Sequence, residues 1–339
     1  MSELADFVRR YADVRIAVVG DLMLDRYIWG RAHRISQEAP VPVVSVDRET
    51  EVPGGAANVV RNITSLGGQA LTVGTVGEDR AGDALLELLR RGGACVDTVI
   101  RCRDRLTTVK ERVVAAGQQV VRIDKEKTGP LDDYTRRIML DGLLDIIRSG
   151  DVDAVIFEDY AKGVLSRELI QTATDEARRT GVKTALDPHP GDPFNVNGLT
   201  LMTPNRVEAF GLAGRYYRPT VLPLQEDKAL LDVGNQLRRQ WQTDYLLVTM
   251  GGDGMALFLA EQSPVHIPTR AREVFDVSGA GDTVTASFLL SLVAGASPVE
   301  AAQLANHAAG IVVAKVGTVP VQAHELVESI HDDHGEVRQ

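Results

Sequence analysis

Short apolar segments alternate with amphipathic segments after residue 130, and this alternation constrains the fold more than any other feature of the sequence. Such a pattern builds a mostly parallel sheet that is covered by helices on both faces. Ligands of these sheets bind beyond the carboxyl ends of the strands. We therefore expect an α/β protein whose site lies at that edge. The expected strands are residues 154–158, 182–187, 199–203 and 245–249, and the expected helices are residues 131–148, 167–180 and 226–241.

The first 130 residues show a different pattern. A Val- and Ile-rich run at residues 15–20 predicts a buried strand that delivers Asp21 to its carboxyl end. Half-exposed strands are expected at residues 41–47, 107–115 and 120–124, and a helix is expected from Ala56. The last two strands should form a hairpin around Ala116 and Gly117. We assign the half-exposed strands to a small β lid, drawn from about residues 24–50 and 105–126.

The chain has 339 residues, of which 44% are hydrophobic, as in an ordinary globular protein. Two Ala-rich helices at residues 283–294 and 298–315 should complete one domain over residues 1–330. Residues 331–339 are expected to form a polar tail.

Charge and cysteine content argue against several classes of protein. The formal net charge of −10 disfavours nucleic-acid binding, which requires neutralisation of phosphates. Cys95 and Cys102 are too few for a disulfide scaffold or a four-thiolate metal site. No apolar run approaches the ~20 residues of a membrane span, and the N-terminus lacks the apolar core of a signal peptide. We expect a cytoplasmic protein with neither nucleic-acid nor membrane partners.

The segment DVSGAGDTVTASF at residues 276–288 carries the strongest chemical signal. Gly279, Ala280 and Gly281 precede a helix that should begin near Asp282. Their backbone N–H groups and the helix N-terminus would form an anion hole for a transferring phosphoryl group. Asp282 could take the proton of an acceptor hydroxyl. The alternative is a Gly-rich turn in which Asp282 is only the N-cap of the helix.

A second glycine-rich segment, PGGAANVVRNITSLG at residues 53–67, opens another helix and is followed by VGTVGEDRAG at residues 73–82. Together with residues 276–288, these segments resemble the paired signatures of the ribokinase-like (PfkB) carbohydrate kinases. The resemblance extends from about residue 15 to residue 320. It implies a ribokinase-like three-layer sandwich with a β lid, and ATP and Mg²⁺ as cofactors.

The resemblance also assigns roles to individual residues. Asp282 would be the catalytic base, and Gly279, Ala280 and Gly281 the anion hole. NRVE at residues 205–208 is similar to the motif that positions magnesium through water, and TMGGDG at residues 249–254 is similar to the nucleotide loop. The sugar site would be lined by Gly54, Gly55 and Asn58, the magnesium site by Asn205 and Glu208, and the nucleotide site by these two residues and by Thr249, Gly251, Gly254, Asn306 and His307.

Several stretches resemble one subfamily, the kinases of D-glycero-β-D-manno-heptose 7-phosphate. They are GDLMLDRY at residues 20–27, RISQEAPVPVV at 34–44, PGGAAN at 53–58, EDYAKG at 158–163 and DVSGAGDT at 276–283. Members phosphorylate the anomeric 1-hydroxyl, giving heptose 1,7-bisphosphate for ADP-heptose and lipopolysaccharide synthesis. Some relatives carry a fused nucleotidyltransferase with a His-x-Gly-His motif. That motif is absent here, so we expect a monofunctional kinase.

A phosphorylated acceptor needs cations in its site. Lys110, Arg112 and Arg122 lie on the expected lid strands and could clamp the sugar phosphate. They could also be solvated charges that protect an edge strand from aggregation. Asp21 and Asp25 are expected to accept hydrogen bonds from sugar hydroxyls. Asp159 and Lys162 complete the expected substrate site, and Lys162, after a core strand, is expected to face the transferring phosphoryl group.

Other functions fit the sequence less well. The chain has neither a Walker A motif nor a dinucleotide fingerprint, which disfavours P-loop kinases and dehydrogenases. A kinase for another sugar, such as fructose 6-phosphate, and a catalytically silent sugar-binding regulator stay open. The apolar lid strands further predict a homodimer that is joined through the lid.

Overall fold

The computed structural model describes residues 3–191, 194–220, 222–260, 262–271 and 273–336. Within these ranges a nine-stranded sheet forms the centre of the protein. Its strands run parallel except for the antiparallel pairs that β12 forms with β11 and β13. Their order is β13 (Val265–Ile267), β12 (Met255–Phe258), β11 (Tyr245–Thr249), β10 (Leu201–Met202), β9 (Lys183–Asp187), β8 (Ala154–Glu158), β1 (Arg15–Gly20), β4 (Gln69–Gly77) and β5 (Val99–Cys102).

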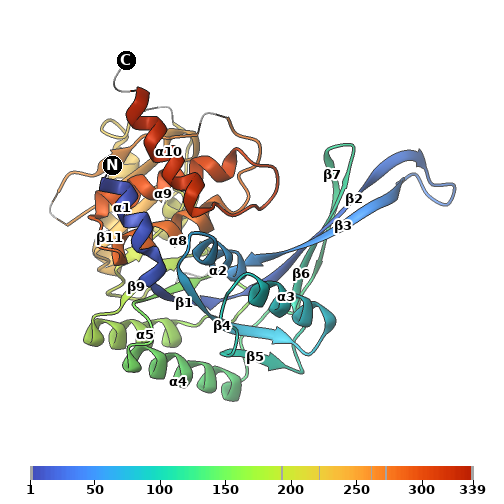
Figure 1. Cartoon of the computed structure of the whole chain (residues 1–339), viewed down its shortest axis with the longest axis horizontal. Helices are drawn as coiled ribbons and strands as arrows, with labels where there is room; N and C mark the ends of the chain where they lie inside the picture. The colour runs from blue at the N-terminus through green and yellow to red at the C-terminus, as the bar shows by residue number, and fades with distance from the viewer. Residues whose placement is uncertain (1–2, 192–193, 221, 261, 272, 337–339) are drawn as a thin grey trace.

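Helices cover both faces of the sheet, which is the middle layer of three (Figure 1). Alternation along β1 supplies both cores, since Ile16 and Val18 pack on one face and Ala17 and Val19 on the other. The first face is covered by α1 (Glu3–Arg9), α2 (Ala56–Ser65), α3 (Arg80–Arg91), α8 (Ala280–Val293), α9 (Pro298–Val313) and α10 (Ala323–Glu336). The second is covered by α4 (Asp133–Ser149), α5 (Arg167–Thr180), α6 (Arg206–Leu212) and α7 (Lys228–Trp241). Short 3₁₀ turns occur at Arg10–Asp13 and Gly251–Asp253.

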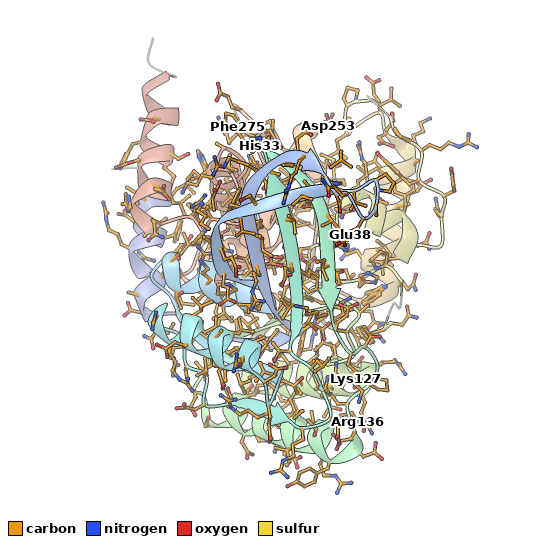
Figure 2. All side chains as sticks on the ribbon, turned by 90° about the vertical axis from the view of Figure 1, so that its right-hand side faces the viewer. His33, Glu38, Lys127, Arg136, Asp253 and Phe275 are labelled. Atoms are coloured by element: carbon orange, nitrogen blue, oxygen red, sulfur yellow. The ribbon has the colours of Figure 1, made fainter. Side chains whose placement is uncertain are left out.

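A separate four-stranded sheet, the lid, projects from the sandwich toward the right of Figure 1. Its strands, in order across the sheet, are β3 (Pro42–Gly55), β2 (Leu22–Ile35), β6 (Thr108–Ala115) and β7 (Gln118–Lys125). Ala116 and Gly117 form the β6–β7 turn with φ values of 51° and 78°, as a two-residue hairpin requires. Figure 2 views this sheet face-on, with His33 and Glu38 at the far end of the β2–β3 hairpin.

The expected α/β architecture is confirmed, with a mostly parallel sheet, helices on both faces and a small separate sheet. Helices and strands expected after residue 130 occur within three residues of their expected bounds. The strand expected at 41–47 extends to Gly55, because its backbone stays paired with β2 through a charged segment that lacks hydrophobic alternation. Residues 331–336 of the expected tail belong to α10, and residues 337–339 lie outside the described residues.

None of the helices in the described ranges combines the length and the apolar character that a membrane span requires.

Close packing of α7 on β12 generates a stability prediction. A Cβ atom on Gly234 would come within 2.2 Å of the Phe258 ring. We predict that Gly234→Ala destabilises the protein by about 1–3 kcal/mol through overpacking. Gly142→Ala in α4 is the matched control, because its Cβ would meet no atom within 4 Å. The control should stabilise the fold by about 0.5–1 kcal/mol. Urea denaturation measures both free energies, and equal shifts in the two variants would contradict the prediction.

Candidate active site

Asp282 lies in the first turn of α8, at the carboxyl edge of the central strands. The helix begins at Ala280, and Gly279 is its N-cap with a left-handed φ of 77°. Asp282 is therefore inside the helix and is not its cap. No side chain of the described residues caps this N-terminus. The N–H of Ala280 donates to the carbonyl of Val277 at 3.2 Å. The other N–H groups at this end and the positive end of the helix dipole can bind an anion.

Both carboxylate oxygens of Asp282 accept hydrogen bonds from side chains. Asn58 Nδ2, in the first turn of α2, donates to Oδ2 at 2.6 Å, and the Tyr160 hydroxyl donates to Oδ1 at 2.6 Å. Asp282 is only 6% exposed. Burial raises the pKa of Asp282, while the two hydrogen bonds oppose that rise. The carboxylate is held in one orientation and has the character of a general base.

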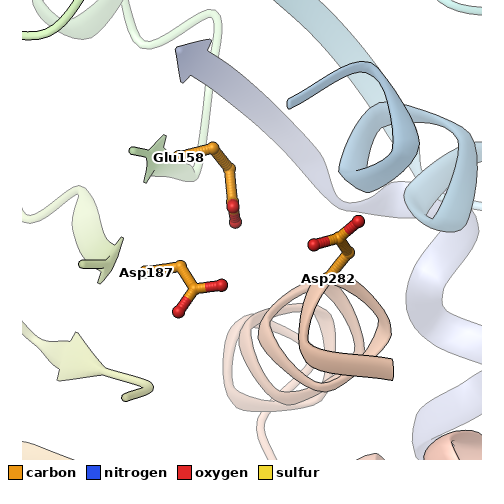
Figure 3. Close-up of side chains that lie close together, drawn as sticks. All are labelled: Glu158, Asp187 and Asp282. Carbon is orange, nitrogen blue, oxygen red and sulfur yellow. The ribbon is translucent and has the colours of Figure 1, made fainter. Parts of the chain in front are cut away.

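Glu158 and Asp187 direct their carboxylates into the same space as Asp282 (Figure 3). Glu158 ends β8 and Asp187 ends β9, and one oxygen from each of the three carboxylates lies within 4.8 Å of the others. Burial, reinforced by neighbouring carboxylates, raises the pKa of both Glu158 and Asp187 well above the usual range. Neither oxygen of Glu158 has a hydrogen-bond partner among the described residues. Buried oxygens of this kind suit a divalent cation.

Asp21 holds the loop that carries Tyr160. Its carboxylate accepts the N–H groups of Tyr160, Lys162 and Val164 at 3.0, 3.0 and 3.1 Å. These bonds give Asp21 a structural role, and its expected hydrogen bonds with sugar hydroxyls stay a prediction. Asp159 also turns into this loop, where it accepts the N–H of Ala161 at 2.9 Å.

The main chain of Asp21 ties three elements together. Its N–H donates to the carbonyl of Glu158 at 3.4 Å, and its carbonyl accepts the N–H of Ala56 at 3.1 Å. Gly55, immediately before Ala56, has a φ of 56°, and a Cβ there would lie 2.6 Å from the Asp21 carbonyl oxygen. The contact between the start of α2 and the end of β1 therefore requires glycine at this position.

One face of the lid carries a basic cluster, Lys110, Arg112 and Arg122. The β6–β7 register pairs Arg112 with Arg122, and Lys110 lies two residues before Arg112 on the same face. Arg112 donates to Asp25 at 2.7 Å. The Lys110 ammonium lies 5.3 Å from the centre of the Tyr160 ring. Lys110 and Arg112 thus lie beside Tyr160 and Asp25, and the expected role of the cluster as a phosphate clamp stays a prediction.

Arg122 of this cluster and Lys162 of the loop after β8 each form an ion pair with a carboxylate. Arg122 forms an exposed pair with Asp124 at 2.8 Å. Lys162 pairs with Glu126 at 2.8 Å, which links the loop to the end of the lid. Gly54 leaves room for the buried Asp25, because a Cβ there would lie 2.6 Å from Asp25 Oδ2.

A cavity of about 200 Å³ opens on the other side of the α8 N-terminus. Its lining is largely apolar and glycine-rich, as a flat nucleobase requires. Asn306 borders it and donates to the carbonyl of Pro268 at 2.6 Å. The lining brings together the sequence-predicted residues Thr249, Gly251, Gly254, Ala280, Gly281 and Asn306.

Two sequence-based assignments look different in the structure. His307 does not border this cavity; its Nδ1 lies 2.9 Å from Ser329 Oγ, between α9 and α10. Asn205 and Glu208 form a reciprocal capping box at the start of α6. Burial also raises the pKa of Glu208, and its charge contributes to the raised pKa of Asp187. Glu208 therefore lies close enough to act on the carboxylate cluster.

Sequence reasoning missed Glu158, Tyr160 and Asp187 as site residues. Glu158 and Asp187 each end an apolar strand, which was a usable signal because the ends of parallel strands form the site. Tyr160 lies with Glu158 in the EDYAKG motif at residues 158–163, and that motif was the signal that could have identified it.

The fold can be compared with those of known proteins. The structure is similar to Arabidopsis thaliana ribokinase complexed with ribose and ATP, with a TM-score of 0.72 and 21% identity over 93% of this chain and 98% of that one. It is also similar to Escherichia coli phosphofructokinase-2 in complex with potassium, with a TM-score of 0.75 and 18% identity over 93% and 97% of the two chains. These similarities show a ribokinase-like fold. The model of the pfkB family carbohydrate kinases matches residues 14–324, and the chain belongs to that family.

Membership in this family makes the protein a sugar kinase and implies that it uses ATP. Its relatives include the bifunctional protein HldE of Pelobacter propionicus, 42% identical over 94% of this chain and 64% of the relative. The bifunctional protein HldE of a Caulobacter species is 41% identical over 98% of this chain and 66% of the relative. The chain thus spans about two thirds of the length of these relatives.

The position of Asp282 generates a catalytic prediction. Asp282→Asn should lower kcat by about 10²–10⁴-fold, because the amide matches the carboxylate in size but is not basic. ATP binding, measured by calorimetry, should persist. Asp175→Asn, on an exposed face of α5, is the control and should leave kcat unchanged. An Asp282→Asn variant that retained more than about a tenth of wild-type kcat would show that Asp282 is not the base.

Proposed function

We propose that the protein transfers the γ-phosphoryl group of ATP to the anomeric hydroxyl of D-glycero-β-D-manno-heptose 7-phosphate, giving heptose 1,7-bisphosphate. The observation that carries phosphoryl transfer is the buried Asp282 carboxylate, fixed by Asn58 and Tyr160 beside an uncapped helix N-terminus. The choice of heptose rests on the subfamily motifs at residues 20–27, 34–44 and 158–163. The product would enter ADP-heptose and lipopolysaccharide synthesis, and the reaction would take place in the cytoplasm, where ATP and sugar phosphates are present.

The acceptor hydroxyl would lie beside Asp282, which takes its proton as the oxygen attacks phosphorus. The N–H groups at Gly279–Gly281 would receive the charge that develops on the phosphoryl oxygens. The cavity bordered by Thr249, Gly254 and Asn306 would hold the adenine. This arrangement puts the nucleotide and the sugar on opposite sides of the first turn of α8.

The carboxylate cluster fits Mg²⁺. Glu158 and Asp282 are buried and Asp187 is half-buried, their oxygens lie near one another, and those of Glu158 lack donors among the described residues. Glu158 and Asp187 would hold the ion, directly or through water, and Glu208 and Asn205 would support it from the start of α6. When bound, Mg²⁺ would supply positive charge that offsets the carboxylates and the charge on the phosphates of ATP.

The lid would select a phosphorylated acceptor. Lys110, Arg112 and Arg122 supply positive charge on the face that also carries Asp25. Burial lowers the pKa of Lys110, and the nearby Lys162, Arg112 and Arg122 act in the same direction. Cations that repel one another in this way would gain from a bound phosphate dianion.

The rival candidate is a kinase for another sugar phosphate on the same site, because the basic cluster does not by itself distinguish one sugar phosphate from another. A panel of sugar phosphates, with product mapping by phosphorus NMR, tests the proposal. Heptose 7-phosphate should give the highest kcat/KM and a product phosphorylated at the anomeric position. A higher kcat/KM for fructose 6-phosphate would replace the proposed acceptor.

The phosphate clamp generates a specific prediction. Arg112→Ala should raise KM for the sugar phosphate about ten- to a hundred-fold, as expected for loss of a charge-assisted contact. KM for ATP should stay unchanged. Arg91→Ala is the control, since Arg91 pairs with Glu87 on the exposed surface of α3. If the preference for phosphorylated over free heptose survives in single Ala variants of Lys110, Arg112 and Arg122, the clamp lies elsewhere.

We also propose that two copies of the chain pair through their lids. Exposed apolar side chains gather on the lid strands, and β7 is an edge strand whose residues are all exposed. An edge of this kind is protected when a second copy covers it. The exposed apolar residues of the lid include Ile35, Val41, Val46, Val120, Val121 and Ile123.

Light scattering tests the dimer. The wild type should be dimeric at micromolar concentration, and Val121→Asp should shift it to monomer because the substitution places a charge in the apolar contact. Ile138→Asp on α4, at a similar exposure of 42% against 47% for Val121, should leave the mass unchanged. A monomeric wild type that stays monomeric with substrate would refute pairing through the lid.

A further inference from the structure

Tyr160 connects two parts of the site that are otherwise separate. Its hydroxyl donates to Asp282 Oδ1 at 2.6 Å, and its ring lies 5.3 Å from the Lys110 ammonium on the lid. A carboxylate oxygen accepts hydrogen bonds, so at this distance the Tyr160 hydroxyl serves as the donor.

The backbone around Tyr160 is held firmly. Asp21 accepts the N–H of Tyr160 itself and those of Lys162 and Val164. Ala161 has a φ of 55° and Gly163 a φ of 93°, and a Cβ on Gly163 would lie 2.1 Å from the Gly129 carbonyl oxygen. A loop fixed at so many points keeps the Tyr160 hydroxyl at one position.

The base needs such a fixed donor. Asp282 extends from α8 into a space that it shares with the Glu158 and Asp187 carboxylates. Asn58 holds only Oδ2, so rotation about the bond to the carboxyl group is prevented by the second donor, Tyr160, on Oδ1. Loss of that donor would let the carboxylate turn away from the acceptor.

We propose that Tyr160 is a positioning residue. Its hydroxyl orients the Asp282 carboxylate, and its ring holds the Lys110 side chain of the lid at a fixed position relative to that carboxylate. The proposal rests on the assignment of Asp282 as the base. It does not depend on heptose being the acceptor, because neither contact involves the sugar.

Tyr160→Phe tests the hydroxyl alone, since the ring and its contact with Lys110 remain. We expect kcat to fall about ten- to a hundred-fold with little change in KM for ATP, as loss of a charge-assisted hydrogen bond acting on the base predicts. Tyr11→Phe is the matched control. The Tyr11 hydroxyl lies 2.6 Å from Ser291 Oγ, so this variant also removes a buried hydroxyl contact to α8, but at the end of the helix remote from Asp282. Its kcat should stay at the wild-type value.

The ring is tested by Tyr160→Leu. This variant should reproduce the loss of kcat and also raise KM for the sugar phosphate, because Lys110 loses the aromatic face against which it packs. Equal KM values in the Phe and Leu variants would remove the lid from the proposal.

A double variant distinguishes a positioning role of Tyr160 from a nonspecific structural effect of its substitution. Tyr160→Phe should have little further effect in an Asp282→Asn protein, because the hydroxyl acts through the carboxylate that is already lost. The acceptor is the sugar phosphate on which the wild type is fastest, so failure of the heptose assignment leaves the comparison intact. An unchanged kcat in Tyr160→Phe, an equal loss in Tyr11→Phe, or losses that multiply in the double variant would each overturn the proposal.

Discussion

Repulsion among buried carboxylates is the constraint around which this site is built. Strands β8 and β9 and helix α8 bring the buried Glu158 and Asp282 and the half-buried Asp187 together. Isolated from donors, such groups would take up protons and lose both basicity and affinity for a metal. Asn58 and Tyr160 stabilise the charge on Asp282, and the helix dipole of α8 acts in the same direction. The donors around the cluster, the uncapped helix and the nearby Lys110 follow from that requirement.

Much of the fold, and the proposal of Asp282 as the base, could be derived from the sequence. Short apolar runs such as residues 154–158 and 245–249 alternate with amphipathic segments, which predicts a parallel sheet covered by helices. Residues 279–282 alone could be a Gly-rich turn, and they point to a base only together with the second glycine-rich segment at residues 53–67. The carboxylate cluster could not be predicted in the same way, because Glu158 and Asp187 become neighbours only through the order β9-β8-β1. The role of Asp21 depends on three loop N–H groups, whose direction no pattern of side chains encodes. Strand order and backbone direction are properties of tertiary packing.

Under the proposed function, the division between sandwich and lid would separate phosphoryl transfer from selection of the acceptor. Asp282 and its neighbouring carboxylates belong to the sandwich, while the basic cluster belongs to strands of a different sheet. Residues of the lid alternate between two faces. Lys110 and Arg112 point to the site, and Arg26, Glu51 and Glu111 form an ion-pair network on the opposite face. Substitutions at alternate lid positions could therefore change the acceptor while the phosphoryl-transfer machinery stays intact, as a family with one fold and many sugars requires.

A single residue separates strand β1 of the sandwich from strand β2 of the lid. That residue is Asp21, whose main chain is bonded to Glu158 and Ala56 and whose carboxylate holds the loop after β8. The lid is consequently joined to the sandwich at this point by one hydrogen-bonded residue, without a flexible linker. A rotation of the lid that changes the backbone torsion angles at Asp21 would therefore displace both the loop after β8 and the start of α2. Substrate binding to the lid would thus be coupled through Asp21 to the two segments that carry Tyr160 and Asn58, the hydrogen-bond donors to Asp282.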